Sequence, residues 1–371
     1  MKSSFSKIVK YLFWAGVAVA LMYFSLKDVK WSEFLTALKQ CRWEFIVAGI
    51  ASLLSAYAFR GLRWRHLMRT VDPSTRWIST FNGVNIGNLA NFIFPRLGEL
   101  VRCGYVARHT ARGEDGKHIV KYDKVLGTAL LDRVMDISML FVILLTLLAV
   151  FWGKFKALFS GEMPDPVGHD GLAQVGQDGL AQVGQEAAGV GPNMTLIWIV
   201  LALVGALIVF LIVACIFRNR HPLFRKIADF IKGIWMGFKA CLHMKHAWKV
   251  FALTGCVWAM YWTMGVCITY AAPVADGIYA ADVLSPLDAL FLLIAGSIGM
   301  LIPVPGGFGS FHLIVAAALV SPAIFPALHT AGLSMGYQTA MIFAVLAHES
   351  QALAMIVGGV FSYIHELFRK D

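Results

Sequence analysis

Apolar blocks of about 20 residues recur along the chain, and this feature restricts its fold more than any other. A helix of that length crosses the hydrocarbon core of a bilayer, which is about 30 Å thick. Only 15% of the residues are charged, whereas soluble domains contain about 25%. The sequence therefore predicts an all-α polytopic membrane protein. Its expected spans lie at about 8–26, 44–62, 124–152, 194–217, 250–272 and 335–361.

The charges between these blocks are distributed unevenly, and the distribution predicts the orientation of the spans. Residues 60–76 hold five arginines and one acid, and residues 218–249 hold eight Lys or Arg and one acid. The connections 153–193 and 273–289 are acidic instead. Because basic loops stay on the cytoplasmic side, we expect both termini in the cytoplasm. The net charge of +10 then suits an anionic lipid leaflet rather than nucleic acid, for which no recognised module is present.

Two further apolar stretches do not fit as simple spans. Residues 77–110 leave one basic region and enter another, so both of their ends are expected on the cytoplasmic side. Residues 286–322 begin and end on the outer side by the same reasoning. Helix breakers lie at the middle of each stretch, beginning at Pro95 in the first and at Pro303 in the second. We therefore predict two re-entrant helical hairpins, in addition to about six transmembrane helices.

A span, a hairpin and a span follow one another twice, in opposite orientations. Inverted repeats with interrupted segments in matching positions are typical of transporters, although coincidence in a hydrophobic chain is the alternative. If the two units form one path, the hairpin tips near Pro95 and Pro305 should approach each other. The expected organisation is an N-terminal helix with an outer connector at 1–43, the first unit at 44–152, a flexible external loop with a tandem octapeptide at 153–193, a span and a cytoplasmic interfacial amphipathic helix (or a plain connector) at 194–249, and the inverted second unit at 250–371.

The densest group of polar residues lies in the first hairpin. Three asparagines at three-residue spacing form a loose polar stripe on one helix face. Beyond the break, an acid and an arginine share a face at i, i+3, and another arginine lies near them. Guanidinium groups bind phosphate with two hydrogen bonds, and a helix N-terminus adds positive potential. The pattern favours a site for an anionic lipid headgroup, and the alternative is a polar surface turn in which the acid neutralises an arginine. The residues of this candidate site are Asn88, Asn91, Arg96, Glu99 and Arg102.

A second charged group, Asp132-Arg133-x-x-Asp136, lies inside the span at 124–152. Arg133 is about nine residues from its start, or roughly 13 Å by helical rise. Pairing of Arg133 with Asp136 within the helix would reduce the cost of burying these charges. The alternative is that Arg133 pairs across to Glu99 and locks the first hairpin, which would add all three residues to the headgroup site.

The second hairpin carries a glycine-rich turn and a histidine, at Pro305, Gly306, Gly307, Gly309 and His312. Such glycines allow tight turns and expose amides that bind anions, but the Lys-Ser/Thr of a Walker loop is absent. His348 and Glu349 lie about fourteen residues into the last span, where an ionisable pair predicts a functional site. A neutral, hydrogen-bonded histidine in ordinary packing is the alternative. We expect no metal and no cofactor, since the pair has no further ligand cluster and the six cysteines include no C-x-x-C.

In this order, the motifs resemble those of the lysylphosphatidylglycerol synthase transmembrane family, also called flippase-like. The resemblance rests on Asn88-x-x-Asn91-x-x-x-Pro95-Arg96-Leu97-Gly98-Glu99-x-x-Arg102, Asp132-Arg133-x-x-Asp136 and Pro305-Gly306-Gly307-x-Gly309. The family often has Glu at the place of His312 and Arg at the place of His348. The resemblance implies a multi-pass protein of a bacterial or archaeal plasma (inner) membrane that flips aminoacylated phospholipids. The soluble aminoacyl-transferase domain of the bifunctional members is expected to be absent, because the chain ends at Asp371.

Residues and resemblance together predict a transporter, rather than an enzyme, that moves an anionic-headgroup phospholipid or aminoacyl-phospholipid between leaflets. No ATPase motif is present, so uphill transport would need an ion gradient or a partner. The expected partners are the phospholipid, the anionic leaflet, and a second copy of the chain or an envelope enzyme. Two alternatives stay open: a lipid-modifying transferase that uses His312, His348 or Glu349 as acid/base groups, and a non-catalytic envelope assembly factor.

Overall fold

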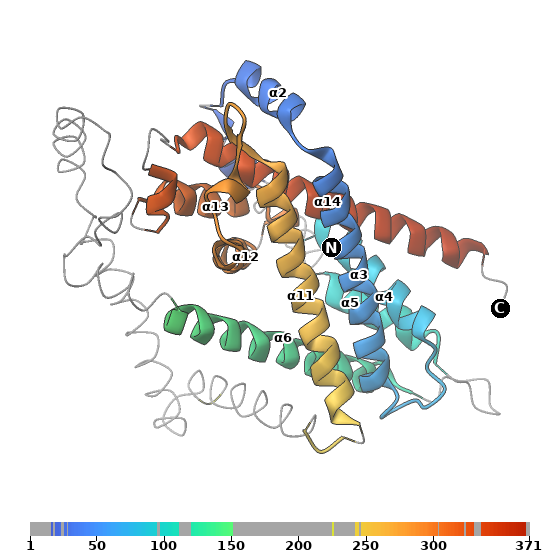
Figure 1. Cartoon of the computed structure of the whole chain (residues 1–371). Coiled ribbons are helices and arrows are strands. Elements are labelled where there is room, and N and C mark those ends of the chain that lie inside the picture. The colour runs from blue at the N-terminus through green and yellow to red at the C-terminus, as the bar shows by residue number, and fades with distance from the viewer. Residues whose placement is uncertain are drawn as a thin grey trace, which may run out of the picture. The chain divides into compact units, whose positions relative to one another are not determined.

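The computed structural model describes residues 16–17, 19–23, 26–27, 29–94, 97–110, 120–150, 225, 242–244, 246–302, 304–322, 324–329 and 335–368. The chain divides into two compact units, one formed by Met1–Thr146 and Cys241–Asp371 and the other by Leu147–Ala240. Apart from the end of one helix and Arg225, the described residues belong to the first unit. They are mostly helical, as predicted (Figure 1).

The described helices follow one another with short connections. In chain order they are α2 (Trp31–Gln40), α3 (Trp43–Met68), α4 (Trp77–Ile93), α5 (Gly98–Ala107), α6 (Tyr122–Val150), α11 (Ala247–Ala271), α12 (Pro286–Gly299), α13 (Ser310–Val320) and α14 (Tyr337–Phe368). A short antiparallel pair, β1 (Pro273–Ala275) and β2 (Ile278–Tyr279), follows α11, with Pro273 opposite Tyr279. The 3-10 helices are η1 (Ala280–Asp282), η2 (Pro305–Gly307) and η3 (Pro326–His329).

Four of the predicted spans coincide with long helices. α3, α11 and α14 are long and apolar enough to cross a membrane. α6 has 29 residues, which at 1.5 Å per residue extend over about 43 Å, more than a hydrocarbon core. The predicted span at 194–217 and the external loop at 153–193 lie outside the described residues, as do most of the span at 8–26 and most of the interfacial helix. The total of six spans therefore stays a prediction.

The predicted end of the second span is wrong. The sequence interpretation ended it at residue 62 and placed Arg60 and Arg63 in a cytoplasmic basic loop, whereas α3 continues to Met68. Arg60 is only 7% exposed and Arg63 is fully buried. The physical reason is that other helices surround this part of α3. Carboxylates on those helices compensate most of the positive charge of the arginines gathered there.

Both predicted hairpins are pairs of short helices, interrupted where the sequence places its breakers. The first break falls at 94–97 between α4 and α5, and the second at 300–309 between α12 and α13, around η2. Within the second turn, Gly306, Gly307 and Gly309 have φ angles of 59°, 76° and 78°. L side chains rarely adopt this conformation, so the turn depends on these glycines.

Small residues bring α4 and α5 into close contact. A Cβ atom at Gly83 would lie 2.8 Å from the Val106 side chain, and one at Gly98 would lie 2.1 Å from the Gly87 carbonyl oxygen. The Gly98 N–H donates a hydrogen bond of 2.7 Å to Asn91 Oδ1, which ties the two arms together across the break. The Gly83-x-x-x-Gly87 pair thus allows the close approach that its spacing predicts.

The two helix–hairpin–helix segments pack against each other. α3 lies along α11, and α4 lies against α14 (Figure 1). The hairpin turns also meet, since the rings of Phe92 and Phe308 have centroids 5.5 Å apart in an edge-to-face arrangement. A Cβ atom at Gly306 would lie 3.2 Å from the Phe92 ring. The predicted approach of the hairpin tips is therefore confirmed.

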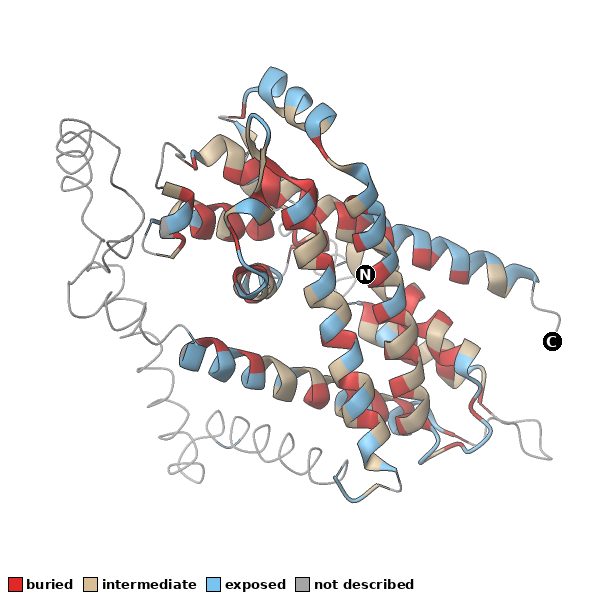
Figure 2. Cartoon of the chain, in the orientation of Figure 1, coloured by how far each residue is buried: buried red, intermediate tan, exposed pale blue. Residues whose placement is uncertain are grey.

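Many residues of α6 and of the C-terminal half of α14 are exposed (Figure 2). Large apolar side chains are among them. Phe141 is 59% exposed, Phe361 is 56% exposed and Leu367 is 65% exposed. Soluble monomers rarely expose apolar surface on this scale, because its contact with water is unfavourable. A hydrocarbon environment around these helices accounts for the surface.

The contact at Gly98 leads to a prediction about stability. Gly98→Ala should destabilise the folded state by about 1–3 kcal/mol or more, because its Cβ would overlap the Gly87 carbonyl oxygen. Gly104→Ala is the matched control on the same helix, because a Cβ there meets nothing within 4 Å. Thermal unfolding of the detergent-solubilised variants should show a lower midpoint for Gly98→Ala alone. Equal midpoints would contradict the close packing of α4 on α5.

Candidate functional site

Seven charged residues from three helices gather within the helix bundle, and we refer to them as the charged cluster. Both of its α3 members were assigned to a loop from the sequence, while its α5 and α6 members were predicted as site residues. The members are Arg60 and Arg63 on α3, Glu99 and Arg102 on α5, and Asp132, Arg133 and Asp136 on α6.

Asp132 lies at the centre of the charged cluster and is fully buried. Its Oδ1 accepts a hydrogen bond of 2.8 Å from Arg63 Nε, and its Oδ2 accepts one of 3.1 Å from Arg102 Nη1. The Arg102 guanidinium also lies 4.6 Å from the centre of the Trp64 ring, in a cation–π contact. Arg63 reaches a fourth helix through a hydrogen bond of 3.3 Å from Nη1 to Thr254 Oγ1. One carboxylate thus joins α3, α5 and α6.

The other two carboxylates each bridge two arginines. Glu99 Oε2 lies 2.7 Å from Arg102 Nη2, as the i, i+3 spacing predicts, and Glu99 Oε1 pairs with Arg133. Asp136 Oδ1 lies 2.8 Å from Arg63 Nη1, and Asp136 Oδ2 lies 3.6 Å from Arg133 Nη1. Both arrangements considered for Arg133 are therefore present, since it pairs within α6 and also across to the first hairpin.

Arg60 has no such partner. Four guanidinium groups face three carboxylates in the charged cluster, which leaves one positive charge in excess. Among the described residues, no carboxylate lies within ion-pair distance of Arg60, and its hydrogen bond is a long one of 3.5 Å from Nη1 to Asn88 Oδ1. Its Nε has no partner within the described part of the chain, although the side chain is buried.

Buried amide groups near Arg60 on α4 also lack partners. Among described residues, the Asn88 Nδ2 and both polar side-chain atoms of Asn85 make no hydrogen bond. A buried polar group without a partner is unfavourable by about 1–3 kcal/mol, and a buried charge by more. Arg60 and Asn88, which contact each other, therefore offer two buried donors that a small anionic group would satisfy, whereas Asn85 lies beside Gly358 of α14.

The sequence interpretation missed the α3 arginines, but a signal for them exists. Asp132 and Asp136 lie well inside an apolar helix, where each carboxylate needs a cationic partner. Arg133 alone cannot neutralise both. The pair Arg60-x-x-Arg63 continues the helical pattern of the preceding span. When both arginines are counted as loop charges, this continuation of the helix is overlooked.

The remaining predicted residues of the first hairpin have different outcomes. Asn88 contacts Arg60, whereas Asn91 closes the break between α4 and α5 and makes no contact with the charged cluster among the described interactions. Arg96 lies outside the described residues, as does Pro95.

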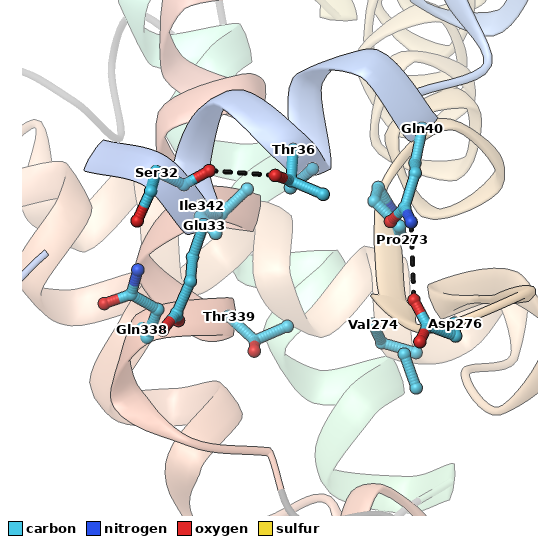
Figure 3. Close-up of a pocket in the computed structure, with 12 residues that line it drawn as sticks. Ser32, Glu33, Thr36, Gln40, Pro273, Val274, Asp276, Gln338, Thr339 and Ile342 are labelled. Atoms are coloured by element: carbon cyan, nitrogen blue, oxygen red, sulfur yellow. Dashed lines mark hydrogen bonds between the residues drawn. The ribbon is translucent and has the colours of Figure 1, made fainter. Parts of the chain in front are cut away.

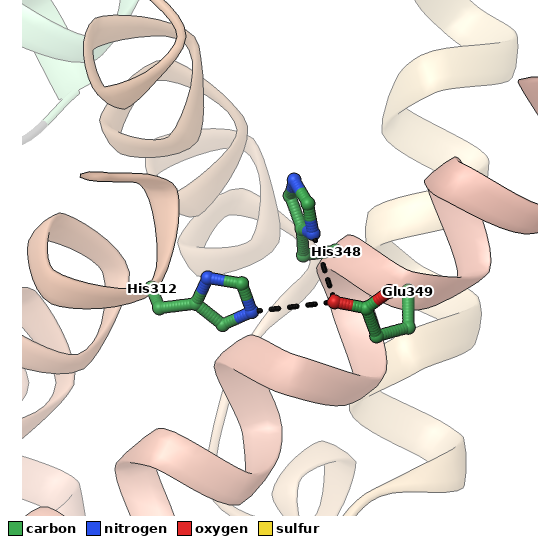
Figure 4. A group of neighbouring side chains, drawn as sticks. All are labelled: His312, His348 and Glu349. Carbon is green, nitrogen blue, oxygen red and sulfur yellow. Dashed lines mark hydrogen bonds and ion pairs between the residues drawn. The ribbon is translucent and has the colours of Figure 1, made fainter. Parts of the chain in front are cut away.

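His312, His348 and Glu349 form a second group, which we call the histidine cluster (Figure 4). The Glu349 Oε1 lies 3.1 Å from His348 Nδ1 and 3.6 Å from His312 Nε2, and the two imidazole centroids are 4.7 Å apart. Both histidines are buried, and Glu349 is partly exposed. The glycine-rich turn lies directly beside them, because His348 Nε2 lies 2.9 Å from the Gly306 carbonyl oxygen.

The amides of this turn are not free to bind an anion, contrary to expectation. The Gly307 N–H donates to the Val304 carbonyl oxygen at 3.2 Å, and the Gly309 N–H donates to His312 Nδ1 at 3.3 Å. The positive φ angles that the glycines allow turn the chain back on itself, so its amides point to local acceptors.

A further polar group, not predicted from the sequence, joins α5 to the end of α14. Glu366 accepts hydrogen bonds of 2.5 Å from the Tyr105 hydroxyl and 2.8 Å from the ring of His109. The Asn82 Nδ2 lies 3.2 Å from the same hydroxyl and 3.0 Å from His365 Nδ1. Apart from Asn82 Oδ1, which has no partner among the described residues, the groups of this set bond to one another, and we assign them to packing of the first hairpin on α14.

Pockets lie between several of the described helices. One, of about 310 Å³, lies between α2, β1 and the start of α14 and is lined by polar residues such as Glu33, Gln40 and Asp276 (Figure 3). Another, of about 200 Å³, is mostly apolar and lies between α11, α12, α13 and α14. Tyr261 lines the second pocket and also lies within electrostatic range of Arg60.

Comparison with known proteins finds a family match for the N-terminal part of the chain. Residues 11–162 match the family model described as the Lysylphosphatidylglycerol synthase TM region. The resemblance predicted from the motifs is confirmed over these residues, which include every member of the charged cluster. No curated protein and no solved structure matches the chain.

The position of Asp132 leads to a second prediction about stability. Asp132→Asn should destabilise the fold by about 3–5 kcal/mol, because it leaves buried guanidinium groups without a counter-charge. Asp123→Asn, at an exposed position in the first turn of the same helix, should change stability by less than about 0.5 kcal/mol. In a background that keeps only Cys103, which is fully buried, heating the solubilised protein with a thiol-reactive dye reports unfolding. Matching curves for the two variants would show that the charged cluster does not hold the helices together.

Proposed function

We propose that this chain, which carries a lysylphosphatidylglycerol synthase TM region at residues 11–162, moves an anionic-headgroup phospholipid between the leaflets of its membrane. The family match supports a lipid-related role in a membrane. One observation carries the finer proposal: Arg60 is buried and positively charged, and no described carboxylate pairs with it.

The chemistry of a phospholipid headgroup suits this position. A phosphodiester carries one negative charge, which equals the excess charge of the cluster. Its oxygens accept hydrogen bonds from guanidinium and amide groups, and Arg60 Nε and Asn88 Nδ2 are donors without described partners. A sugar or a neutral metabolite would leave the charge of Arg60 uncompensated.

The surroundings of Arg60 suit the apolar part of a lipid. The apolar pocket of about 200 Å³ extends from Tyr261 to residues of α12 and α13, such as Leu292 and Val315. Its volume is below that of typical small-molecule sites, about 300–1,000 Å³, so it suits part of an acyl chain rather than a whole lipid. A charged group beside an apolar pocket is the combination expected for an amphipathic substrate.

The arrangement of the hairpins supports movement rather than simple binding. Each helix–hairpin–helix segment places a broken pair of short helices between two long ones. In the proposal, the two segments are an inverted repeat, and rocking of one against the other exposes Arg60 alternately to the two leaflets. The headgroup site comprises Arg60 and Asn88, with Arg96 as a further phosphate-binding residue. The paired members of the cluster hold this site in place.

The proposed orientation has a direct test. With the charge distribution of the loops, Thr70→Cys should be cytoplasmic and Asp276→Cys should be external, because both positions are exposed in connections between helices. In a cysteine-free background, a membrane-impermeant maleimide added to intact cells should label Asp276→Cys and spare Thr70→Cys until the membrane is opened. Labelling of both positions in intact cells would exclude two cytoplasmic termini and the six-span arrangement.

The proposed role of Arg60 predicts opposite behaviour for two arginines one turn apart. Arg60→Leu should leave thermal stability unchanged or raised, because it removes an unpaired buried charge, while it abolishes lipid movement. Arg63→Leu should lower stability by about 3–5 kcal/mol, because it leaves Asp132 and Asp136 without their shared partner. Thermal unfolding, together with the reduction of a headgroup-labelled fluorescent phospholipid in proteoliposomes, measures both effects.

Mass analysis of the recovered lipid separates transport from the alternatives. Unchanged lipid mass with Arg60-dependent movement supports a transporter, and an altered mass would indicate a transferase. If Arg60→Leu moves lipid as fast as the unmodified chain, the proposed headgroup site is wrong. If neither protein moves lipid, a non-catalytic assembly factor becomes the better interpretation.

A further inference from the structure

In the histidine cluster, two hydrogen-bond acceptors face each other. The backbone groups beside the two imidazole rings determine which ring nitrogens are acceptors. A neutral imidazole carries one N–H and one lone pair, so a fixed partner on one nitrogen determines the state of the other. Both histidines have such a partner in the backbone of the glycine-rich turn. The protonation of the cluster can therefore be deduced from backbone groups whose roles are unambiguous.

His348 must donate from its Nε2. The partner of this atom is the carbonyl oxygen of Gly306 at 2.9 Å, which can only accept. In a neutral ring, Nδ1 then carries a lone pair, yet Nδ1 faces Glu349 Oε1 at 3.1 Å. Two acceptors at that distance repel each other unless a cation lies between them.

His312 is oriented the opposite way. The Gly309 N–H, which can only donate, points at His312 Nδ1 at 3.3 Å. The Nδ1 of a neutral ring therefore carries the lone pair and Nε2 carries the hydrogen. That Nε2 faces Glu349 Oε1 at 3.6 Å, too far for a hydrogen bond, and has no other partner among the described residues.

A metal ion fits these constraints poorly. The three facing atoms lie within 4.8 Å of one another, a separation that a metal could bridge. A neutral His312 has no lone pair on Nε2, so it cannot act as a ligand without losing its bond from Gly309. Only His348 and Glu349 would remain, whereas zinc sites use three or four protein ligands. A proton needs only those two groups.

The surroundings of His348 are mostly apolar. The His348 ring lies against Phe308 and Phe311, with centroids 4.9 Å and 5.1 Å away. From η2, α13 and α14, the only titratable groups facing His348 within the described residues are His312 and Glu349. Glu349 is 43% exposed while both rings are buried, so a proton can reach the cluster through its carboxylate.

We infer that His348 and Glu349 together hold one exchangeable proton, and that its binding and release couple the second hairpin to the proton gradient across the membrane. On binding, the proton forms a bond to His348 Nδ1, and the resulting imidazolium donates to the Glu349 carboxylate. On release, that N–H bond breaks and two lone pairs face each other, which drives the side chains of His348 and Glu349 apart and weakens the hold of His348 on the Gly306 turn. The coupling part of this inference rests on the proposed function, and the proton site does not.

The test of the proton site uses Glu349→Gln, with Glu33→Gln as the matched control. Glu33 is a carboxylate on α2 that is exposed and remote from both clusters. In Glu349→Gln, the amide can donate to His348 Nδ1, so the conflict disappears without a bound proton. The unfolding temperature of the unmodified chain should fall as pH rises and the proton leaves, whereas that of Glu349→Gln should stay level.

Proton uptake by the full chain in nanodiscs gives the direct count. When the pH is lowered in weak buffer, without reaching the acid range in which free carboxylates become protonated, Glu349→Gln should take up about one proton fewer than the unmodified chain. Glu33→Gln should take up as many protons as the unmodified chain, because it removes an exposed carboxylate outside the histidine cluster. Equal uptake in Glu349→Gln and the control would overturn the proton site. So would binding of one Zn²⁺ or Mn²⁺ per chain that both Glu349→Gln and His312→Gln abolish, because that result assigns the cluster to a metal.

Coupling is tested in proteoliposomes with an imposed pH gradient. The gradient should accelerate movement of the labelled phospholipid by the unmodified chain and by Glu33→Gln, and should have no effect on Glu349→Gln. An equal response of all three would overturn the coupling while leaving the proton count intact. Absence of lipid movement in every protein, with or without the gradient, would instead refute the proposed function.

Discussion

The carboxylate of Asp132 accepts hydrogen bonds from guanidinium groups on two other helices, and it does so with no exposed surface. In a membrane, such a charge persists only if its partners are fixed in place. The positions of α3, α5 and α6 relative to one another therefore depend on this group. The same contacts fix the position of the first hairpin, because Arg102 lies on its second arm, α5. The excess charge at Arg60 is a further consequence, since every carboxylate in the cluster is already shared between two arginines.

Much of this arrangement could be predicted from the sequence. Pro95 and Gly98 locate the first break, and the glycines at 306, 307 and 309 locate the second, because few other residues adopt the required backbone. The pairing of Glu99 with Arg102 follows from helical spacing. Arg60 and Arg63 were misplaced because orientation rules count charges by their distance along the chain, whereas Arg63 is held by a carboxylate 69 residues away. The third member of the histidine cluster, His312, lies on a different helix from His348 and Glu349. Its place beside them depends on tertiary packing, which the local sequence pattern does not contain.

The charged cluster and the histidine cluster occur in corresponding parts of the two helix–hairpin–helix segments, but their chemistry differs. Arginines stay protonated at any physiological pH, so the first cluster has a fixed charge. Imidazole and carboxylate groups can gain or lose a proton, so the charge of the second cluster can vary. Each is built on a hairpin, and each uses a broken helix to bring side chains from separate segments together. One segment is thus suited to recognition of an anion and the other to a change of state.

The contact between Phe92 and Phe308 has a mechanical consequence. Each ring belongs to the turn region of a different hairpin, and Gly306 lies so close that a Cβ atom there would come within 3.2 Å of the Phe92 ring. Close-packed aromatic groups transmit displacement because they cannot be compressed. A shift of either hairpin along its own axis must therefore displace the other. Through this contact, a movement of one broken helix is coupled to a movement of the other.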